Sequence, residues 1–272
     1  MNKFKFAISD YKNSDACIIS FFQNDEERKN LEKLRNFGDI EPIDPKNFEN
    51  ILENLKICDV GNVKFKDFDE IYEKVLKIKQ DKKVPIIFSC NHLTTLFSVG
   101  ICEENSSILI FDAHADLKDF YESNYSRATW LRRLVELIDS ERIFLIGIRS
   151  FDEDEKKFLE EEKINFLSSF KIKESIKNSI KKINDFLSSF DNVYVSFDVD
   201  VMENYLISSN YPEAFGLNMF EIYEIINNLE INDFVAMDFT EFIINKKEDA
   251  INLMNIVFQF LKKLKFTLSN KK

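Results

Sequence analysis

The chain has 272 residues, 44% hydrophobic and 31% charged, with a formal net charge of −11. This length suits a domain with a full hydrophobic core, and the negative charge argues against a nucleic-acid-binding surface. The charge mildly favours a cationic substrate, although solubility explains it equally well. No apolar run approaches the roughly 20 residues of a membrane span, and the N-terminus lacks a signal-peptide core of about 7–15 apolar residues. The four cysteines show no paired spacing, so reduced thiols and a cytoplasmic location are expected.

Short apolar runs alternate with helical patterns along the chain. The runs predict buried parallel strands at 16–21, 84–89, 107–111, 142–148, 193–197 and 234–239. Apolar stripes at helical spacing predict helices over 67–79, 172–187 and 250–265. Because strands and helices alternate throughout, we expect an α/β fold in which helices cover both faces of a mostly parallel central sheet. No linker or internal repeat is present, so residues 1–272 are expected to form one domain.

Both histidines stand next to aspartates at the ends of predicted strands. The residues concerned are His92 after one strand, Asp112, His114 and Asp116 after the next, and Asp198 with Asp200 after a third. Side chains alternate along a strand, so the middle three should converge on one point and the last two aspartates on another. Ligands of open α/β sheets bind beyond the carboxyl ends of strands, so these six side chains predict a site for two divalent metals. Helix N-caps would explain any one segment but explain all three poorly.

Three segments in this order resemble the ureohydrolase family, which includes arginase, agmatinase, guanidinobutyrase and formiminoglutamase. The family's Gly-Gly-Asp-His, Asp-Ala-His-x-Asp and Ser-x-Asp-x-Asp segments stand here as Ser89-Cys-Asn-His92, Asp112-Ala-His-Ala-Asp116 and Ser196-Phe-Asp-Val-Asp200. Supporting similarity lies at 59–63, 146–150, 211–217 and 238–241, and the segment at 146–150 resembles the agmatinase branch. The resemblance covers about residues 55–265, whereas 1–50 are divergent. It implies an arginase/deacetylase-like, three-layer α/β/α fold.

The resemblance also implies two manganese ions per chain. One ion would take His92, Asp112, Asp116 and Asp198, and the other would take Asp112, His114, Asp198 and Asp200. Carboxylate-rich sites suit Mn²⁺ better than thiolate-preferring metals, although Zn²⁺ and Fe²⁺ remain alternatives. Such a pair of metals makes hydroxide available near neutral pH for attack on a guanidine or formimidoyl carbon. By resemblance, Asp116 would hold the hydroxide and Glu241 would pair with the cationic C–N group of the substrate.

The chain departs from the family where agmatinases and arginases carry a proton-shuttling histidine. Here the segment reads Ser126-Arg-Ala-Thr-Trp-Leu-Arg-Arg133, so Arg127 replaces that histidine. Arginine is a poor general acid or base and repels a guanidinium group. Formiminoglutamases similarly lack the histidine, and Arg127 could bind their anionic substrate. The alternative is that Arg127 points to solvent together with Arg132 and Arg133.

These features predict a binuclear-manganese, agmatinase-like hydrolase of linear, non-peptide C–N bonds, which releases urea and an amine. One alternative is a formiminoglutamase-like hydrolase with an anionic formimidoyl substrate. Another is a metal-binding family member that has lost catalysis, because the shuttle histidine is missing and Ser89 and Cys90 replace two glycines. A one-zinc, deacetylase-like site fits two histidines and four aspartates less well. The family resemblance implies a homo-oligomer, and neither nucleic acid nor membrane is an expected partner.

Overall fold

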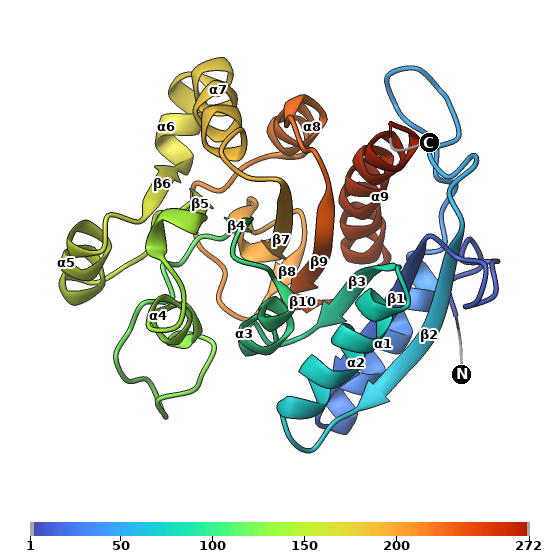
Figure 1. The fold of residues 1–272 in the computed structure, drawn as a ribbon, viewed down its shortest axis with the longest axis horizontal. Helices are drawn as coiled ribbons and strands as arrows, with labels where there is room; N and C mark the ends of the chain where they lie inside the picture. The colour runs from blue at the N-terminus through green and yellow to red at the C-terminus, as the bar shows by residue number, and fades with distance from the viewer. Residues whose placement is uncertain (1–2, 271–272) are drawn as a thin grey trace.

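A computed structural model describes residues 3–270 and contains an eight-stranded sheet with helices on both faces (Figure 1). The strands follow the order β2-β1-β3-β9-β7-β4-β5-β6, and all pair in parallel. Their bounds are β1 Ala16–Phe22, β2 Ile57–Lys64, β3 Val84–Ser89, β4 Ser106–Phe111, β5 Ile143–Gly147, β6 Asn165–Ser168, β7 Asn192–Asp198 and β9 Phe234–Thr240. Two short strands, β8 (Ser208–Ser209) and β10 (Phe242–Ile243), form a separate antiparallel pair. The predicted three-layer α/β/α architecture is confirmed.

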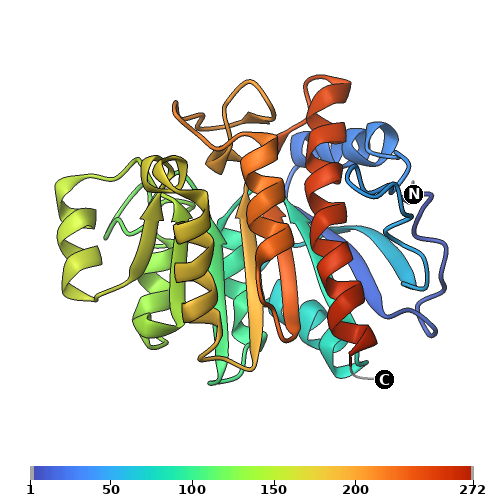
Figure 2. The ribbon, with the colours of Figure 1, turned by 90° about the horizontal axis from the view of Figure 1, so that it is seen from above.

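Two sets of helices cover the sheet. On one face lie α1 (Asp25–Phe37), α6 (Ser169–Glu174), α7 (Ile176–Leu187), α8 (Met219–Asn228) and α9 (Lys247–Ser269). On the other lie α2 (Asp69–Gln80), α3 (Leu93–Ser98), α4 (Trp130–Val135) and α5 (Glu153–Glu161). Figure 2 shows α7, α8 and α9 side by side along one face of the sheet. Within residues 3–270, no helix is both long and apolar enough to cross a membrane.

The predicted strands all form, because each is buried on both of its faces. Along β1, for example, Ile18 enters the core beneath α9 and Ile19 enters the core beneath α2. The six apolar runs coincide with β1, β3, β4, β5, β7 and β9, each to within one residue at either end. The sequence did not predict β2 or β6, which are the two edge strands of the sheet. β6 is largely exposed, and the buried positions of β2 include Asp59 and Asn62, which bond to Arg35, so neither strand carries a continuous apolar run.

The single helix predicted over 172–187 is wrong, because the chain breaks it into α6 and α7 at Ser175. This residue adopts an extended conformation, with φ −159° and ψ 92°. Ile172 of α6 and Ile183 of α7 are nevertheless buried in the same core. The apolar spacing therefore continues across the break, which is why the pattern alone reads as one helix. The helices expected over 67–79 and 250–265 are confirmed as α2 and α9.

Candidate metal centre and active site

The predicted site residues gather at one edge of the sheet, beyond the carboxyl ends of four adjacent strands. The strands β3, β9, β7 and β4 are neighbours in the sheet although they are far apart in sequence. His92 lies three residues beyond β3, Asp112 directly follows β4, Asp198 is the last residue of β7, and Glu241 directly follows β9. Because these strands are parallel, their carboxyl ends lie at the same edge and bring these side chains together.

Asp112, His114 and Asp116 lie beyond the regular strand β4, so alternation along a strand does not explain how they meet. β4 ends at Phe111, and Asp116 has a left-handed backbone conformation with φ 53°. The backbone N–H groups of residues 113 and 114 donate to the carboxylates of Asp200 and Asp112, at 3.0 and 2.6 Å, instead of to another strand. Strict alternation therefore stops, but the side chains still meet at one centre: Asp112 lies between His114 on one side and Asp116, beside His92, on the other. Asp198 and Asp200 contribute to different groups, because Asp200 lies in the 3₁₀ turn η3 (Val199–Val201).

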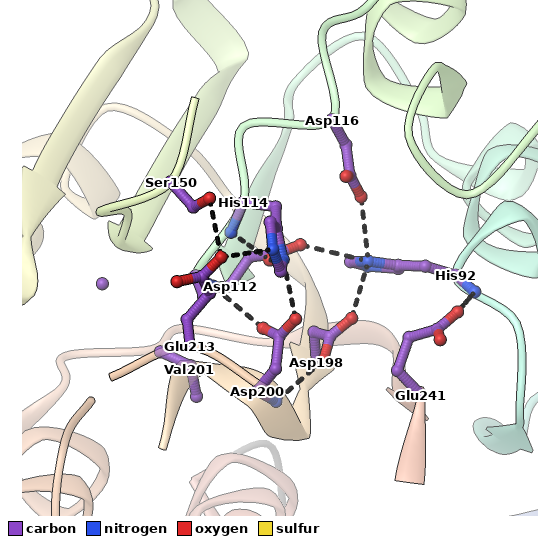
Figure 3. A network of polar contacts seen from close by, with 12 residues as sticks. His92, Asp112, His114, Asp116, Ser150, Asp198, Asp200, Val201, Glu213 and Glu241 are labelled. Atoms are coloured by element: carbon purple, nitrogen blue, oxygen red, sulfur yellow. Dashed lines mark hydrogen bonds and ion pairs between the residues drawn. The ribbon is translucent and has the colours of Figure 1, made fainter. Parts of the chain in front are cut away.

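The six residues form two groups that share Asp112 (Figure 3). In the first group, Nδ1 of His92 lies 3.1 Å from Asp112 Oδ2, 3.2 Å from Asp198 Oδ2 and 3.4 Å from Asp116 Oδ2. In the second group, Nδ1 of His114 lies 2.8 Å from Asp200 Oδ2 and 3.7 Å from Asp112 Oδ1. Asp112 therefore offers one oxygen to each group, which is the geometry of a carboxylate that bridges two cations.

The hydrogen bonds behind His92 show which of its ring nitrogens faces these carboxylates. Ser196 Oγ donates to Asp238 Oδ1 at 2.7 Å, so it must accept from His92 Nε2, 2.9 Å away. Nε2 is then protonated and Nδ1 is the nitrogen that faces the carboxylates; among the described residues this buried atom has no hydrogen-bond partner. Burial lowers the pKa of His92, but Asp112, Asp116 and Asp198 raise it well above its usual value, so without a cation Nδ1 is protonated as well. A divalent cation would take the place of that proton opposite the carboxylates, and a histidine held from behind in this way is typical of metal sites.

The pKa shifts within the cluster also indicate that a positive charge would be stabilised there. Burial and the charges of Asp200 and Asp116 raise the pKa of Asp112 to about 6. Burial, together with Asp200 and Asp112, also raises the pKa of Asp198 well above its usual range. Burial alone would lower the pKa of His114, but hydrogen bonds and charge from Asp112 and Asp200 raise it to about 12. The donor set of four carboxylates and two imidazoles therefore suits hard or borderline divalent cations.

Glu241 and Arg127 form an ion pair at the side of the site opposite His114. Both line a cavity of about 160 Å³ above the aspartates and histidines. Glu241 is buried; its Oε1 accepts the backbone N–H of His92 at 2.8 Å, and its Oε2 accepts Arg127 Nη1 at 2.5 Å. The alternative that Arg127 points to solvent with Arg132 and Arg133 is wrong, because Arg127 pairs with Glu241, whereas the other two arginines pair with Asp119.

Sequence reasoning missed several side chains that hold the predicted ligands. The indole Nε1–H of Trp130 donates to Asp116 Oδ2 at 2.7 Å. Glu213 Oε1 lies 3.5 Å from His114 Nε2 and accepts the Ser150 hydroxyl at 2.9 Å. Glu213 lies in a segment that carried the family resemblance, 211–217, and Trp130 lies in 126–133, where the chain departs from the family, so position in these segments was the available signal. The direction in which either side chain points was not readable from that signal.

Comparison with known proteins agrees with this architecture. The sequence model of the arginase family matches residues 28–259. The N(1)-aminopropylagmatine ureohydrolase of Thermococcus kodakarensis is 31% identical over 202 residues, which cover 70% of this chain and 67% of that protein. An uncharacterized 32.2 kDa protein of Methanothermus fervidus is 28% identical over 219 residues, covering 76% of this chain and 75% of its own.

Solved structures show the same fold. The agmatine ureohydrolase of Thermoplasma volcanium superposes with a TM-score of 0.88 at 22% identity, covering 100% of this chain and 97% of that one. The formimidoylglutamase of Bacillus subtilis superposes with a TM-score of 0.83 at 16% identity, covering 94% and 89%. At these identities the likeness concerns the fold. Because the family match spans most of its length, the chain belongs to the arginase family.

Proposed function

We propose that the protein is a binuclear-manganese hydrolase that cleaves a linear, non-peptide C–N bond of a guanidine or amidine. Membership in the arginase family supports a hydrolase acting on a guanidino or amidino group. The observation that carries the two-metal proposal is the pair of donor groups that share Asp112, together with the buried Nδ1 of His92, which has no hydrogen-bond partner among the described residues.

Two ions would be held by overlapping sets of side chains. The first set is His92, Asp112, Asp116 and Asp198, and the second is Asp112, His114, Asp198 and Asp200. When bound, two such metals lower the pKa of a water molecule toward neutrality and make it a nucleophile. The predominance of carboxylate oxygen among the donors favours Mn²⁺.

Asp116 and Glu241 are assigned roles at the reacting group. Trp130 fixes one oxygen of Asp116 and so orients this carboxylate, which would hold the attacking nucleophile. Glu241 is held by the His92 backbone N–H, and its second oxygen faces the cavity. A carboxylate in this position binds the cationic C–N group of a substrate through charge-assisted hydrogen bonds.

The first candidate substrate is a guanidine of the agmatine type, which would yield urea and an amine. The support is the 31% identity to a relative named N(1)-aminopropylagmatine ureohydrolase. The second candidate is an anionic formimidoyl compound, and a specific observation favours it: the Arg127 guanidinium lines the cavity. Arginine can bind a carboxylate on such a substrate and hold it in a defined orientation.

The proposal is tested by elemental analysis of manganese-loaded protein, paired with a screen for release of urea, ammonia and formamide. The substrates are agmatine, arginine, 4-guanidinobutyrate and formiminoglutamate, and Asp112→Asn is the variant that removes the shared carboxylate. We expect two manganese ions per chain, urea from a guanidine, and loss of both metals and turnover in the variant. Two metals without any product would reject the hydrolase and leave a metal-binding protein; less than one metal per chain would reject the metal centre.

A further inference from the structure

The side chain of Arg127 brings a guanidinium group of the protein itself to the carboxylate that the proposed function assigns to the substrate. We propose that Arg127 is an internal, displaceable guanidinium, which closes the metal cavity and must leave Glu241 before a guanidine or amidine substrate binds. The inference rests on the proposed function, because it takes Glu241 as the substrate's carboxylate. Arg127 is then a specificity-determining residue, because the cationic group of the substrate replaces its guanidinium on Glu241.

The first step is that Glu241 has a single oxygen available for exchange. Its Oε1 accepts the backbone N–H of His92 at 2.8 Å, and this contact remains when the side chain of Arg127 moves. Its Oε2 accepts Arg127 Nη1 at 2.5 Å and Asn210 Nδ2 at 3.2 Å. A substrate guanidinium or amidinium therefore competes with Arg127 for the same oxygen.

The second step is that Arg127 stands between the metal cavity and the outside. It lines the cavity of about 160 Å³ and also an outer groove of about 600 Å³. Among the described residues lining these two spaces, Arg127 is the one that they share. Its side chain is 30% exposed and lies over the ring of Tyr211, 5.2 Å from the ring centroid. This half-buried position allows the guanidinium to leave Glu241 without crossing the core.

The third step concerns where the displaced charge can go. Two cations that compete for the same oxygen of Glu241 in a small cavity repel each other, so Arg127 and a cationic substrate do not both occupy that position. The outer groove is lined by the carboxylates of Glu26 and Glu27, on the first turn of α1, and by the ammonium groups of Lys29 and Lys33. A guanidinium that turns away from Glu241 toward this groove can therefore pair with a carboxylate there, in competition with the two lysines. We call the form with Arg127 on Glu241 closed and the form with Arg127 turned away open. Because only the open form binds substrate, the apparent substrate affinity is the intrinsic affinity multiplied by the fraction of open molecules.

The experiment compares Arg127→Gln with the wild type and with Arg28→Gln, all loaded with manganese. Arg28 is a surface arginine of α1 that pairs with Asp25 and Glu32, so the control removes an ion-paired guanidinium outside both spaces. The dissociation constant of guanidinium chloride is measured by titration calorimetry, and KM and kcat are measured for agmatine. We expect Arg127→Gln to bind guanidinium at least tenfold more tightly and to lower KM more than it changes kcat. Arg28→Gln should match the wild type.

A second set of variants keeps this inference separate from the proposed function. Arg127→Lys retains the charge but not the planar donor, so it should lie between the wild type and Arg127→Gln. In the double variant Arg127→Gln, Glu241→Gln, the gain in guanidinium affinity should disappear. If the gain persists there, Glu241 is not the substrate's carboxylate and the proposed function loses its substrate site. Unchanged or weaker guanidinium binding in Arg127→Gln overturns the internal guanidinium, and a selective loss of formiminoglutamate binding would make Arg127 a substrate ligand instead.

Discussion

The proposed role of His92 as a metal ligand depends on residues that do not line the cavity. Asp238 accepts hydrogen bonds from the hydroxyl groups of Ser196, Thr95 and Tyr194, at 2.7, 2.9 and 2.5 Å. With its hydroxyl proton committed to Asp238, Ser196 can only accept from His92, which fixes the tautomer of the imidazole. The buried network thereby turns Nδ1 toward three carboxylates and away from solvent.

The indole of Trp130 is predicted to control manganese affinity through Asp116. Trp130→Phe removes the 2.7 Å hydrogen bond to Asp116 Oδ2, so the carboxylate is no longer held in place. Loss of such a supporting contact typically lowers metal affinity by about 10- to 100-fold. Competition with a chelator measures this change. The matched control is Tyr11→Phe, which removes a hydrogen bond to Asp81 away from the site, and unchanged affinity in Trp130→Phe would contradict the prediction.

Asp59, in one of the segments that resemble the family, is predicted to act in stability and not in chemistry. Its carboxylate forms a fully buried, two-pronged ion pair with Arg35, with both N···O distances 3.0 Å, and also accepts the N–H of Gly61 at 2.7 Å. Asp59→Asn leaves the Arg35 charge buried without a counter-ion, which should cost about 3–5 kcal/mol in urea unfolding. Lys77→Gln, which breaks an exposed pair, should have a far smaller effect; equal losses would contradict this interpretation.

At the scale of elements, the site depends on how tightly the loops beyond neighbouring strands are packed. Gly147 ends β5 with φ +101°, a conformation that favours glycine. A Cβ there would lie 2.4 Å from Val201 Cγ2 and 3.1 Å from the backbone oxygen of Asp112. These two neighbours belong to the segments that carry Asp200 and Asp112, so the close approach of β5 sets the spacing between them.

Gly147→Ala is therefore predicted to disturb the metal site as well as the fold. The strained backbone should cost about 1–3 kcal/mol of unfolding free energy, and the displaced segments should bind manganese more weakly. Denaturant unfolding and metal titration measure the two effects separately. Gly100→Ala is the control, because its Cβ would meet only the ring of Tyr72, at 3.2 Å. A Gly147→Ala protein with wild-type metal affinity would show that this packing does not position the ligands.

At the scale of the whole molecule, the anionic cluster joins strands from the middle of the sheet, so metal binding should stabilise the entire fold. Ions that bind only the folded chain at about 1,000 times their dissociation constant contribute about 4 kcal/mol, which corresponds to roughly 10 °C in Tm. Calorimetry with manganese and after chelation measures this shift. Asp112→Asn should abolish it, and an equal Tm with and without metal in the wild type would contradict the prediction.

The sequence by itself determined the layered fold and the residues that meet at the carboxyl edge of the sheet. Strands buried on both faces leave continuous apolar runs, and the ligands of such folds follow the ends of those runs. Tertiary structure alone decided which side chains face each other: His92 with Asp198, Trp130 with Asp116, and Arg127 with Glu241. Strand order and loop conformation determine these contacts, and neither leaves a periodic pattern in the sequence. The break at Ser175 was not predictable, since one extended residue hardly alters the local pattern, and the two edge strands were missed because polar or exposed residues interrupt their apolar runs.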